Sequence, residues 1–331
     1  MKHKIEIEGG ATFFVAADED SLLRGALRAG AGFPYECGVG GCGSCRFELV
    51  SGEMQTLWPE APGLSERERK RGKRLACQSR PLSDCVIRVR CADDYRPPIS
   101  TRRRQARLTG RREIAPGMAE FTFHTQEPAA FLPGQYAIFH PPGVAGPRAY
   151  SMSNLPNADG DWRFIIRKVA DGGGSAAMFD TLREGDVIML DAPYGGAFFR
   201  PDKDREIICV GGGSGIGPVV SVARAALAQG GRTIRLFEGA RTAESLCAPS
   251  LFAPQELKAL NYAPVLSAEP EASAWSGARG FLHQEVEKTL AAPDRCEFYF
   301  AGPPPMIEAM QDLLVMRWKA PHDRIHYDKF F

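Results

Sequence analysis

Four cysteines in one fixed pattern constrain this chain more than any other feature. Four residues separate Cys37 from Cys42, two separate Cys42 from Cys45, and 31 separate Cys45 from Cys77. This is the ligand spacing of a plant-type [2Fe–2S] cluster. Glycines, which let backbone approach a small anionic cluster closely, stand between the first three cysteines: Gly38, Gly40, Gly41 and Gly43. The pattern therefore predicts Cys37, Cys42, Cys45 and Cys77 as the metal ligands.

A structural zinc site is the main alternative for these cysteines. Zinc usually takes paired C-x2-C ligands on either side of a spacer, whereas this run holds one tight pair and a distant fourth cysteine. Cys85 and Cys91 lie in the strand-like stretch DCVIRVRC and are expected to be core or surface residues. The nine cysteines of a chain without an export signal are not expected to form a disulfide framework.

Length and composition fit a multidomain protein of the cytoplasm. A chain of 331 residues is long enough for two or three domains. The N-terminus lacks the apolar core of a signal peptide, and no run of 18 apolar residues occurs, so we expect no membrane association. The net charge of +1 gives no basis for binding nucleic acid.

The segments that flank the cysteines predict a small β-rich domain. KIEIEG and ATFFVAADE are strand candidates, and SLLRGALRAG is a helix candidate that Asp20 or Ser21 would cap and Gly30 would end. The charged stretch SERERKRGKR has two interpretations, a docking surface for a redox partner or a solvated helix face. The solvated helix face is the favoured interpretation.

A change of composition near residues 92–103 indicates a linker. ADDYRPPISTRRR combines a Pro-Pro pair with a run of arginines. Nucleic-acid binding is a weak explanation of these arginines, because no aromatic residues interleave with them. Residues 104–200 then alternate short apolar runs with Pro and Gly turns, which predicts an antiparallel β domain.

Two motifs in this β domain suit a flavin. In Arg148-Ala149-Tyr150-Ser151, the guanidinium can bind pyrophosphate, the tyrosine ring can pack on the isoalloxazine, and the serine hydroxyl can bond near the flavin N5. A glycine-rich loop, Gly172 to Gly174, precedes Ser175 and a short helical segment, and free N–H groups at a helix start bind anions. Gly174 and Ser175 are therefore candidate pyrophosphate contacts, although a flexible hairpin loop is the alternative.

From about residue 202 the pattern becomes α/β. REIICVGGGSGIGPVVSVARAALAQG reads as a buried strand, a glycine turn and a helix, which is the arrangement that brings a dinucleotide pyrophosphate to a helix N-terminus. The next strand ends at Glu238 and Arg241, where a ribose would lie. The turn Ala301-Gly302-Pro303-Pro304-Pro305-Met306 would edge the nicotinamide. The candidate residues of the first turn are Gly211, Gly212, Gly213, Gly215 and Pro218.

Together these motifs resemble the ferredoxin–NADP reductase superfamily. The order of the domains, and the segments FPYECGVGGCGSC, LWPEAPGLSERE, RLACQSRPLSD, RAYS and IHYDKFF, are similar to the reductase components of bacterial soluble di-iron monooxygenases that act on toluene, phenol or alkenes. The resemblance covers essentially the whole chain. It implies a β-grasp [2Fe–2S] ferredoxin domain, an antiparallel β-barrel FAD domain and a Rossmann-like parallel α/β NAD domain.

The resemblance also implies roles for individual residues. FAD would be the flavin, with Arg148, Tyr150 and Ser151 at its ring and phosphates, and Phe331 would stack near the ring. The glycine turn together with Gly302, Pro303 and Met306 would hold the nicotinamide cofactor. Tyr150, Ser151 and Phe331 are thus positioning residues, and no proton-transfer catalyst is expected. Many members carry a cysteine where this chain has Ala301.

The predicted activity is electron transfer from NADH to a partner protein. Nicotinamide gives hydride, a flavin accepts the electron pair, and a [2Fe–2S] centre accepts single electrons. Glu238 favours NADH, because a carboxylate suits a free ribose 2′-OH, whereas Arg241 is a weaker argument for NADPH. The expected acceptor is the oxygenase or hydroxylase component of a multicomponent monooxygenase, or its Rieske ferredoxin.

Three other functions are weighed against this one. A reductase of a Rieske-type ring-hydroxylating dioxygenase would share every cofactor and differ only in its partner. A non-catalytic redox sensor would need an output module, and a free-standing flavin reductase would not need the four cysteines. The predicted domains are residues 1–93 for ferredoxin, 94–102 for the linker, 103–201 for FAD and 202–331 for NAD(P)H.

Overall fold

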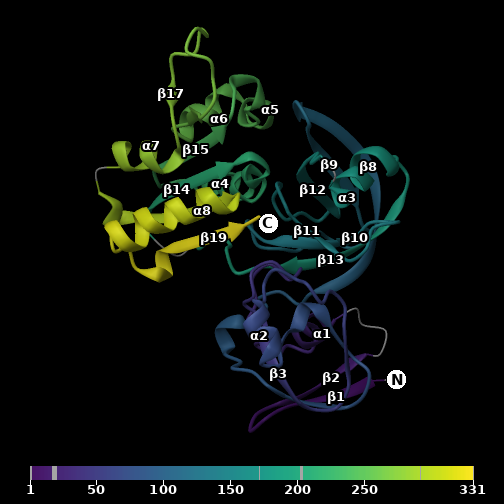
Figure 1. Ribbon diagram of the computed structural model, residues 1–331. Helices are drawn as coiled ribbons and strands as arrows, with labels where there is room; N and C mark the ends of the chain where they lie inside the picture. The colour runs from purple at the N-terminus through teal and green to yellow at the C-terminus, as the bar shows by residue number, and fades with distance from the viewer. Residues whose placement is uncertain (1, 17–20, 171, 202–203, 291, 331) are drawn as a thin grey trace. The chain divides into compact units, whose positions relative to one another are not determined.

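The computed structural model describes residues 2–16, 21–170, 172–201, 204–290 and 292–330. Within it the chain divides into two compact units. The first comprises residues 1–103, 145–149 and 191–196, and the second comprises residues 104–144, 150–190 and 197–331. Figure 1 shows the ribbon of both. None of the helices in the described ranges combines the length and apolar character that crossing a bilayer requires.

The first unit has a mixed β-sheet with one helix packed on it, the β-grasp arrangement that the sequence predicted (Figure 1). The strand order is β2-β1-β7-β3-β5, in which β1 and β7 are parallel and the other neighbours are antiparallel. Strands β4 and β6 form a separate pair. The elements are β1 (Lys2–Ile7), β2 (Thr12–Ala16), α1 (Leu22–Arg28), β3 (Arg46–Ser51), β4 (Met54–Thr56), α2 (Glu66–Lys70), β5 (Lys73–Leu75), β6 (Ser79–Pro81) and β7 (Cys85–Arg88).

Both helices of this unit begin at a serine. The Ser21 side chain accepts a hydrogen bond from the Arg24 N–H at 3.3 Å, so Ser21 caps α1. Gly30 follows the helix with φ +76°, a conformation that glycine adopts without strain. Ser65 caps α2 within a reciprocal pair with Glu68. No residue of α2 is buried, so both interpretations of the charged stretch, a docking surface and a solvated helix face, stay open.

A six-stranded antiparallel barrel begins at the predicted linker. The strand order is β11-β10-β13-β8-β9-β12. A bridge between Met152 and Phe164 joins the segment after β11 to β12, and thereby closes the barrel. Aromatic side chains fill its interior, with 4.7 Å between the ring centroids of Phe139 and Phe164. The elements are β8 (Arg102–Ala115), β9 (Met118–His124), β10 (Tyr136–His140), β11 (Arg148–Ser151), β12 (Asp161–Arg167), α3 (Gly173–Ala176) and β13 (Val187–Tyr194).

The rest of the chain forms a parallel sheet covered by helices (Figure 1). The strand order is β17-β16-β15-β14-β18-β19, with every pair parallel. The elements are β14 (Glu206–Gly212), α4 (Ile216–Gln229), β15 (Ile234–Ala240), α5 (Ala248–Leu251), α6 (Pro254–Ala259), β16 (Ala263–Leu266), β17 (Ala278–Arg279), α7 (Leu282–Thr289), β18 (Cys296–Gly302), α8 (Pro304–Gln311) and β19 (Ile325–Lys329).

Strand β14 lies at the centre of this sheet and is buried on both faces. Ile207 and Cys209 pack into one apolar core with residues of α4, and Ile208 and Val210 pack into another with residues of α7 and α8. This explains the continuous apolar run of the sequence, because a strand covered on both faces needs no polar alternation. The strand order reverses beside β14, and ligands of such sheets bind at the carboxyl ends of the strands at that point.

Candidate cofactor sites

The four predicted ligand cysteines lie in the first unit as two pairs. The Sγ atoms of Cys45 and Cys77 are 3.4 Å apart, and both side chains are buried. In the other pair, the Cys42 N–H donates to Cys37 Sγ at 3.4 Å. Hydrogen bonding from the Cys37 thiol lowers the pKa of Cys42. Two irons, each needing two thiolates, match two thiol pairs, so the donor set fits a [2Fe–2S] cluster.

Glycines make the loop around these cysteines as tight as the sequence predicted. A Cβ atom added at Gly43 would lie 2.4 Å from the Gly63 carbonyl oxygen. Gly63 in turn donates its N–H to the Gly40 carbonyl at 2.9 Å. The Ser44 N–H donates to Cys42 Sγ at 3.4 Å, and such N–H···S bonds tune a cluster's potential. Cys85 bonds instead to the Glu53 and Ser83 carbonyls, apart from the ligands.

The predicted flavin residues lie on β11 and at the start of α3. The Tyr150 ring packs edge-on against Phe139, with centroids 5.4 Å apart, and Ser151 is buried. The Arg148 guanidinium donates to the Ala145 and Pro147 carbonyls at 3.1 Å each. Arg148 therefore also fastens its own loop.

Ser175 fixes the shape of the glycine-rich loop. Its Oγ accepts the Val169 N–H at 3.0 Å and donates to the Gly172 carbonyl at 3.0 Å. A Cβ at Gly172 would lie 2.9 Å from this Oγ, so only glycine fits there. The first N–H groups of α3, which starts at Gly173, have no acceptor within the helix. The loop can therefore offer donors to a pyrophosphate, as FAD requires.

The segment after the flavin strand is anchored on α4. The Ser221 hydroxyl donates to the Asn154 carbonyl at 2.7 Å, and the Arg224 guanidinium donates to the Ser153 carbonyl at 2.7 Å. A Cβ at Gly217 would lie 3.8 Å from the Ser151 carbonyl oxygen. Within the second unit, Ser151 and the segment after it thus lie beside the helix that follows the predicted nicotinamide turn.

A cavity of about 760 Å³ opens at the carboxyl ends of β14, β15 and β18. This volume lies within the usual range for a small-molecule site. The cavity brings together six residues that the sequence predicted from three separate segments: Gly212, Gly213, Glu238, Arg241, Pro303 and Met306. Gly213 has φ +57°, and a Cβ there would lie 3.5 Å from the Arg167 guanidinium. The backbone at Gly213 can therefore approach a dinucleotide phosphate closely, with the Arg167 cation beside it.

The other predicted glycines of these turns pack the turns together. A Cβ at Gly215 would lie 2.1 Å from the Ala301 carbonyl oxygen, and one at Gly302 would lie 2.7 Å from Met306 Sδ. A Cβ at Gly211 would likewise lie 2.9 Å from the Cα atom of Ile216. Pro218 lies in the first turn of α4, and Ala301 is buried in β18. Phe331 lies outside the described residues.

The Glu238 carboxylate accepts hydrogen bonds from three groups of the protein. Its carboxylate accepts the Cys247 N–H at 2.6 Å, the Ala248 N–H at 3.1 Å and the Tyr262 hydroxyl at 2.6 Å. The side chain is 2% exposed, and burial raises the pKa of Glu238. The assignment of Glu238 to a ribose stays a prediction, with both oxygens already engaged.

Several residues that line the cavity were not identified from the sequence. They belong to separate elements and carry no local motif: Met118, Arg167, Ser267, Phe281, His283 and Phe330. Phe281 is 61% exposed and stacks on His283, with ring centroids 6.1 Å apart. A large exposed aromatic side chain beside a cavity is a signal that only the folded structure provides.

Comparison with known proteins agrees with this geometry. Three family models match: the 2Fe-2S iron-sulfur cluster binding domain at residues 5–82, the oxidoreductase FAD-binding domain at 105–199 and the oxidoreductase NAD-binding domain at 209–312. The chain therefore belongs to the ferredoxin–NAD(P)+ reductase family with an N-terminal plant-type ferredoxin domain. The predicted fold class, oxidoreductase activity and cofactors (FAD, [2Fe–2S] and NAD(H)) are confirmed.

Relatives match along their whole length. Ferredoxin–NAD(P)(+) reductase CarAd of Metapseudomonas resinovorans is 40% identical over 99% of this chain and 100% of its own. The ferredoxin–NAD(+) reductase component of the alkene monooxygenase system of Xanthobacter autotrophicus is 39% identical over 98% and 100%. The solved ferredoxin reductase in carbazole 1,9a-dioxygenase is 36% identical, with a TM-score of 0.93 over 100% and 99%.

Proposed function

We propose that this chain is the reductase component of a multicomponent monooxygenase acting on an aromatic or alkene substrate. The supporting observation is that one chain carries cluster-, FAD- and NAD-binding domains and is 39% identical, over 98% of its length, to the reductase component of an alkene monooxygenase system. Bound FAD would accept hydride from NADH and release the electrons singly to the [2Fe–2S] centre. The oxygenase component, or its ferredoxin, would be the acceptor.

The residues of the chain supply binding and orientation. Gly212 and Gly213 let the backbone approach the nicotinamide cofactor, and Arg167 offers a cation at the same cavity. The loop that Ser175 fixes offers backbone donors to the flavin pyrophosphate. The segment directly after Tyr150 and Ser151 is held against α4 by hydrogen bonds to Ser153 and Asn154. No side chain needs to move a proton in hydride transfer, so positioning is the protein's contribution.

An anaerobic titration with NADH tests the electron path. Bleaching of the flavin and iron–sulfur absorption, together with a rhombic paramagnetic resonance signal from the reduced cluster, is the expected result. Bleaching of the flavin alone would contradict the path. Cys42→Ser should abolish NADH-dependent reduction of cytochrome c and spare that of ferricyanide. Cys91→Ser, which changes a cysteine outside the ligand set, should leave both reactions intact.

A reductase of a Rieske-type dioxygenase is the second candidate. It is favoured by the 36% identity and the TM-score of 0.93 to the solved ferredoxin reductase in carbazole 1,9a-dioxygenase. NADH-driven substrate oxidation by a di-iron monooxygenase system and by a Rieske dioxygenase system, each supplied without its own reductase, would separate the two. A faster rate with the dioxygenase system would favour the dioxygenase.

A further inference from the structure

We propose that the surface formed by Trp58, the pocket beside it and the cations of residues 67–74 is the docking surface for an electron-accepting protein with an acidic face. The inference rests on the proposed function, because the acceptor collects electrons from the cluster. In each transfer the reduced cluster loses one electron and the acceptor gains one, with NADH as the source. The occupant is a protein acceptor, and its recognition is electrostatic.

Trp58 lies directly over the cluster-binding loop. A Cβ at Gly40, between the ligands Cys37 and Cys42, would lie 3.2 Å from the Trp58 ring and 3.2 Å from the Gln78 side chain. Gln78 follows the ligand Cys77, and its carbonyl accepts the Leu57 N–H at 2.8 Å. Trp58 is nevertheless 45% exposed. A protein that touches this ring therefore contacts a side chain that packs on the loop between Cys37 and Cys42.

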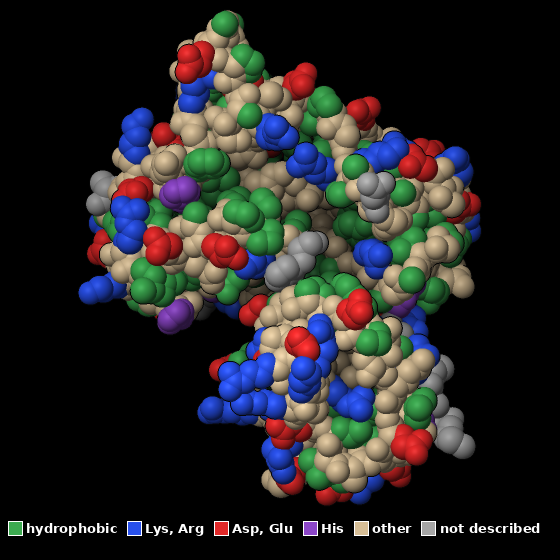
Figure 2. All heavy atoms as spheres, viewed as in Figure 1, with side chains coloured by type: hydrophobic (Ala, Val, Ile, Leu, Met, Phe, Trp, Pro, Cys, Tyr) green, Lys and Arg blue, Asp and Glu red, His purple; other side chains and the backbone are tan. Residues whose placement is uncertain are grey.

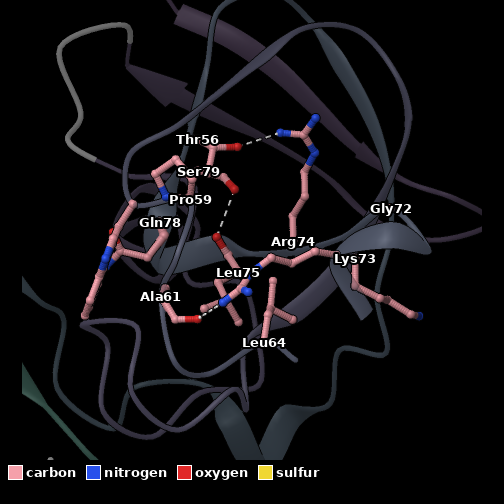
Figure 3. A pocket seen from close by; sticks show the side chains of 12 residues that line it. Thr56, Pro59, Ala61, Leu64, Gly72, Lys73, Arg74, Leu75, Gln78 and Ser79 are labelled. Carbon is pink, nitrogen blue, oxygen red and sulfur yellow. Dashed lines mark hydrogen bonds between the residues drawn. The ribbon is translucent and has the colours of Figure 1, made fainter. Parts of the chain in front are cut away.

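A pocket of about 380 Å³ adjoins Trp58 (Figure 3). Its apolar lining comes from Ala61, Leu64 and Leu75, and Figure 3 shows Gln78 and Lys73 on opposite sides of it. Two polar side chains of the wall bond within the unit. Arg69 donates to the Ala61 carbonyl at 2.8 Å, and Ser79 donates to the Leu75 carbonyl at 2.9 Å. The pocket therefore suits an apolar side chain of a partner, with an aromatic anchor at its edge.

The rim of this surface is strongly cationic. Residues 66–74 hold six Lys or Arg and two Glu, in a chain whose total charge is +1. Figure 2 shows these blue side chains gathered over α2. Lys70 pairs with Glu66, and Lys73 pairs with Glu48. Arg67 and Arg71 are exposed and form no ion pair with any residue that the structure describes. Complementarity then requires carboxylates on the partner.

The cationic helix is fixed to the cluster loop. Arg46, which follows the ligand Cys45, pairs with Glu68 of α2 at 3.0 Å and donates to the Gly63 carbonyl at 3.3 Å. The Gly63–Gly40 backbone bond continues this connection. The charges that would orient a partner and the ring that it would touch thus belong to one rigid assembly around the cluster. This arrangement distinguishes the surface from an isolated solvated helix.

The test compares two charge reversals of equal size in the complete reductase. Arg67→Glu/Arg71→Glu changes the proposed surface. Lys2→Glu/Lys4→Glu changes two exposed lysines of β1, and strands β7 and β3 separate β1 from β5 in the sheet. The probe is cytochrome b5, an acidic one-electron haem protein. Its dissociation constant is measured by isothermal titration calorimetry at low and high NaCl, and its reduction is followed with NADH.

The first variant should bind cytochrome b5 about tenfold or more weakly at low salt, and salt should erase the difference. The second should bind within about twofold of the unmodified chain. Equal losses in both variants, or no loss in the first, would overturn the proposal. Arg67→Gln/Arg71→Gln, which removes the two charges without reversing them, should give a smaller loss of affinity for cytochrome b5. It replaces the charge reversal in the test if the reversed variant does not fold.

Two further outcomes separate this inference from its alternatives. Trp58→Ala should weaken the binding of cytochrome b5, and Trp58→Phe should retain it, with the cluster's paramagnetic resonance signal unchanged in both. Binding to duplex DNA at physiological salt that the Arg67/Arg71 reversal abolishes, without any effect on cytochrome b5, would overturn the docking assignment. If NADH fails to reduce the cluster in the unmodified chain, the proposed function itself fails, and the inference falls with it.

Discussion

At the scale of single residues, Glu238 stands between a structural and a cofactor-binding role. Its three protein donors predict that Glu238→Gln lowers the stability of the second unit by about 1–3 kcal/mol, because a buried donor loses its acceptor. The Michaelis constant for NADH should change less than about twofold. Steady-state ferricyanide reduction and urea unfolding measure the two effects.

The matched control for this change is Tyr262→Phe, which removes only the hydroxyl that reaches Glu238. It should lower stability and leave the Michaelis constant for NADH unaltered. If Glu238→Gln instead raised the Michaelis constant for NADH tenfold and left the stability unchanged, the ribose role that the sequence predicted would be established.

The ionisation of Glu238 predicts a dependence of stability on pH. Burial raises the pKa of Glu238, outweighing its hydrogen bonds, so the folded chain holds this proton at a pH where the unfolded chain has lost it. The resulting stabilisation is complete below the ordinary glutamate pKa of about 4.3 and is lost as pH rises through the folded pKa. Urea unfolding between about pH 4.5 and 8 should show a shallower decline in Glu238→Gln. An identical decline in both proteins would contradict this account.

Contiguous motifs could be predicted from the sequence, whereas contacts between distant elements could not. The cysteine pattern and the strand–glycine–helix segment of β14 and α4 carry their chemistry within short stretches. Arg167 and Phe281 reach the cavity from a barrel strand and from the turn before α7, and no local pattern marks them. Glu238 illustrates the same limit, because its partner Tyr262 lies 24 residues away.

At the scale of elements, Gly215 sets how closely β14, α4 and β18 approach. A Cβ there would lie 2.1 Å from the Ala301 carbonyl oxygen and 2.6 Å from the Gly302 nitrogen, both backbone atoms. Gly215→Ala should therefore displace the turn, costing about 2 kcal/mol or more and raising the Michaelis constant for NADH at least tenfold. Gly110→Ala, where a Cβ meets open space, should change the free energy of unfolding by less than about 0.5 kcal/mol. A folded Gly215→Ala with unchanged NADH kinetics would remove this turn from the cofactor site.

A buried glutamate of β18 contacts a histidine of β19 and pairs with an arginine that precedes β14. The fully buried Glu297 pairs with Arg205 at 2.7 Å and with His326 at 2.8 Å. Glu297→Gln should destabilise the second unit by about 3 kcal/mol, because Arg205 loses its charged partner. The exposed pair of Lys329 with Glu308 supplies the control, and Glu308→Gln should cost less than about 1 kcal/mol. Equal effects in chemical unfolding would mean that burial does not decide the strength of these pairs.

At the scale of the whole molecule, the cluster ligands depend on a different core from the nicotinamide turn and from Tyr150 and Ser151 of the flavin motif, whereas Arg148 belongs to the first unit. All four cysteines lie in the first unit, whereas the cores that pack against both faces of β14 lie within the second. Small units with a metal centre derive much of their folding free energy from it. Removal of the cluster should therefore unfold the β-grasp sheet of the first unit and leave the second unit folded.

Chelation of the iron under reducing conditions tests this separation. The rate of NADH-dependent ferricyanide reduction should stay within about twofold of the rate before chelation. Reduction of cytochrome c should be lost, because no cluster remains to deliver single electrons to it. Differential scanning calorimetry should show that the first unit's transition disappears or moves to lower temperature, with the second unit's transition retained. Ferrous iron and sulfide should restore both the cytochrome activity and the lost transition. A parallel loss of ferricyanide activity would mean that the cluster also maintains the flavin and nicotinamide sites, and the two units would then have to fold as one.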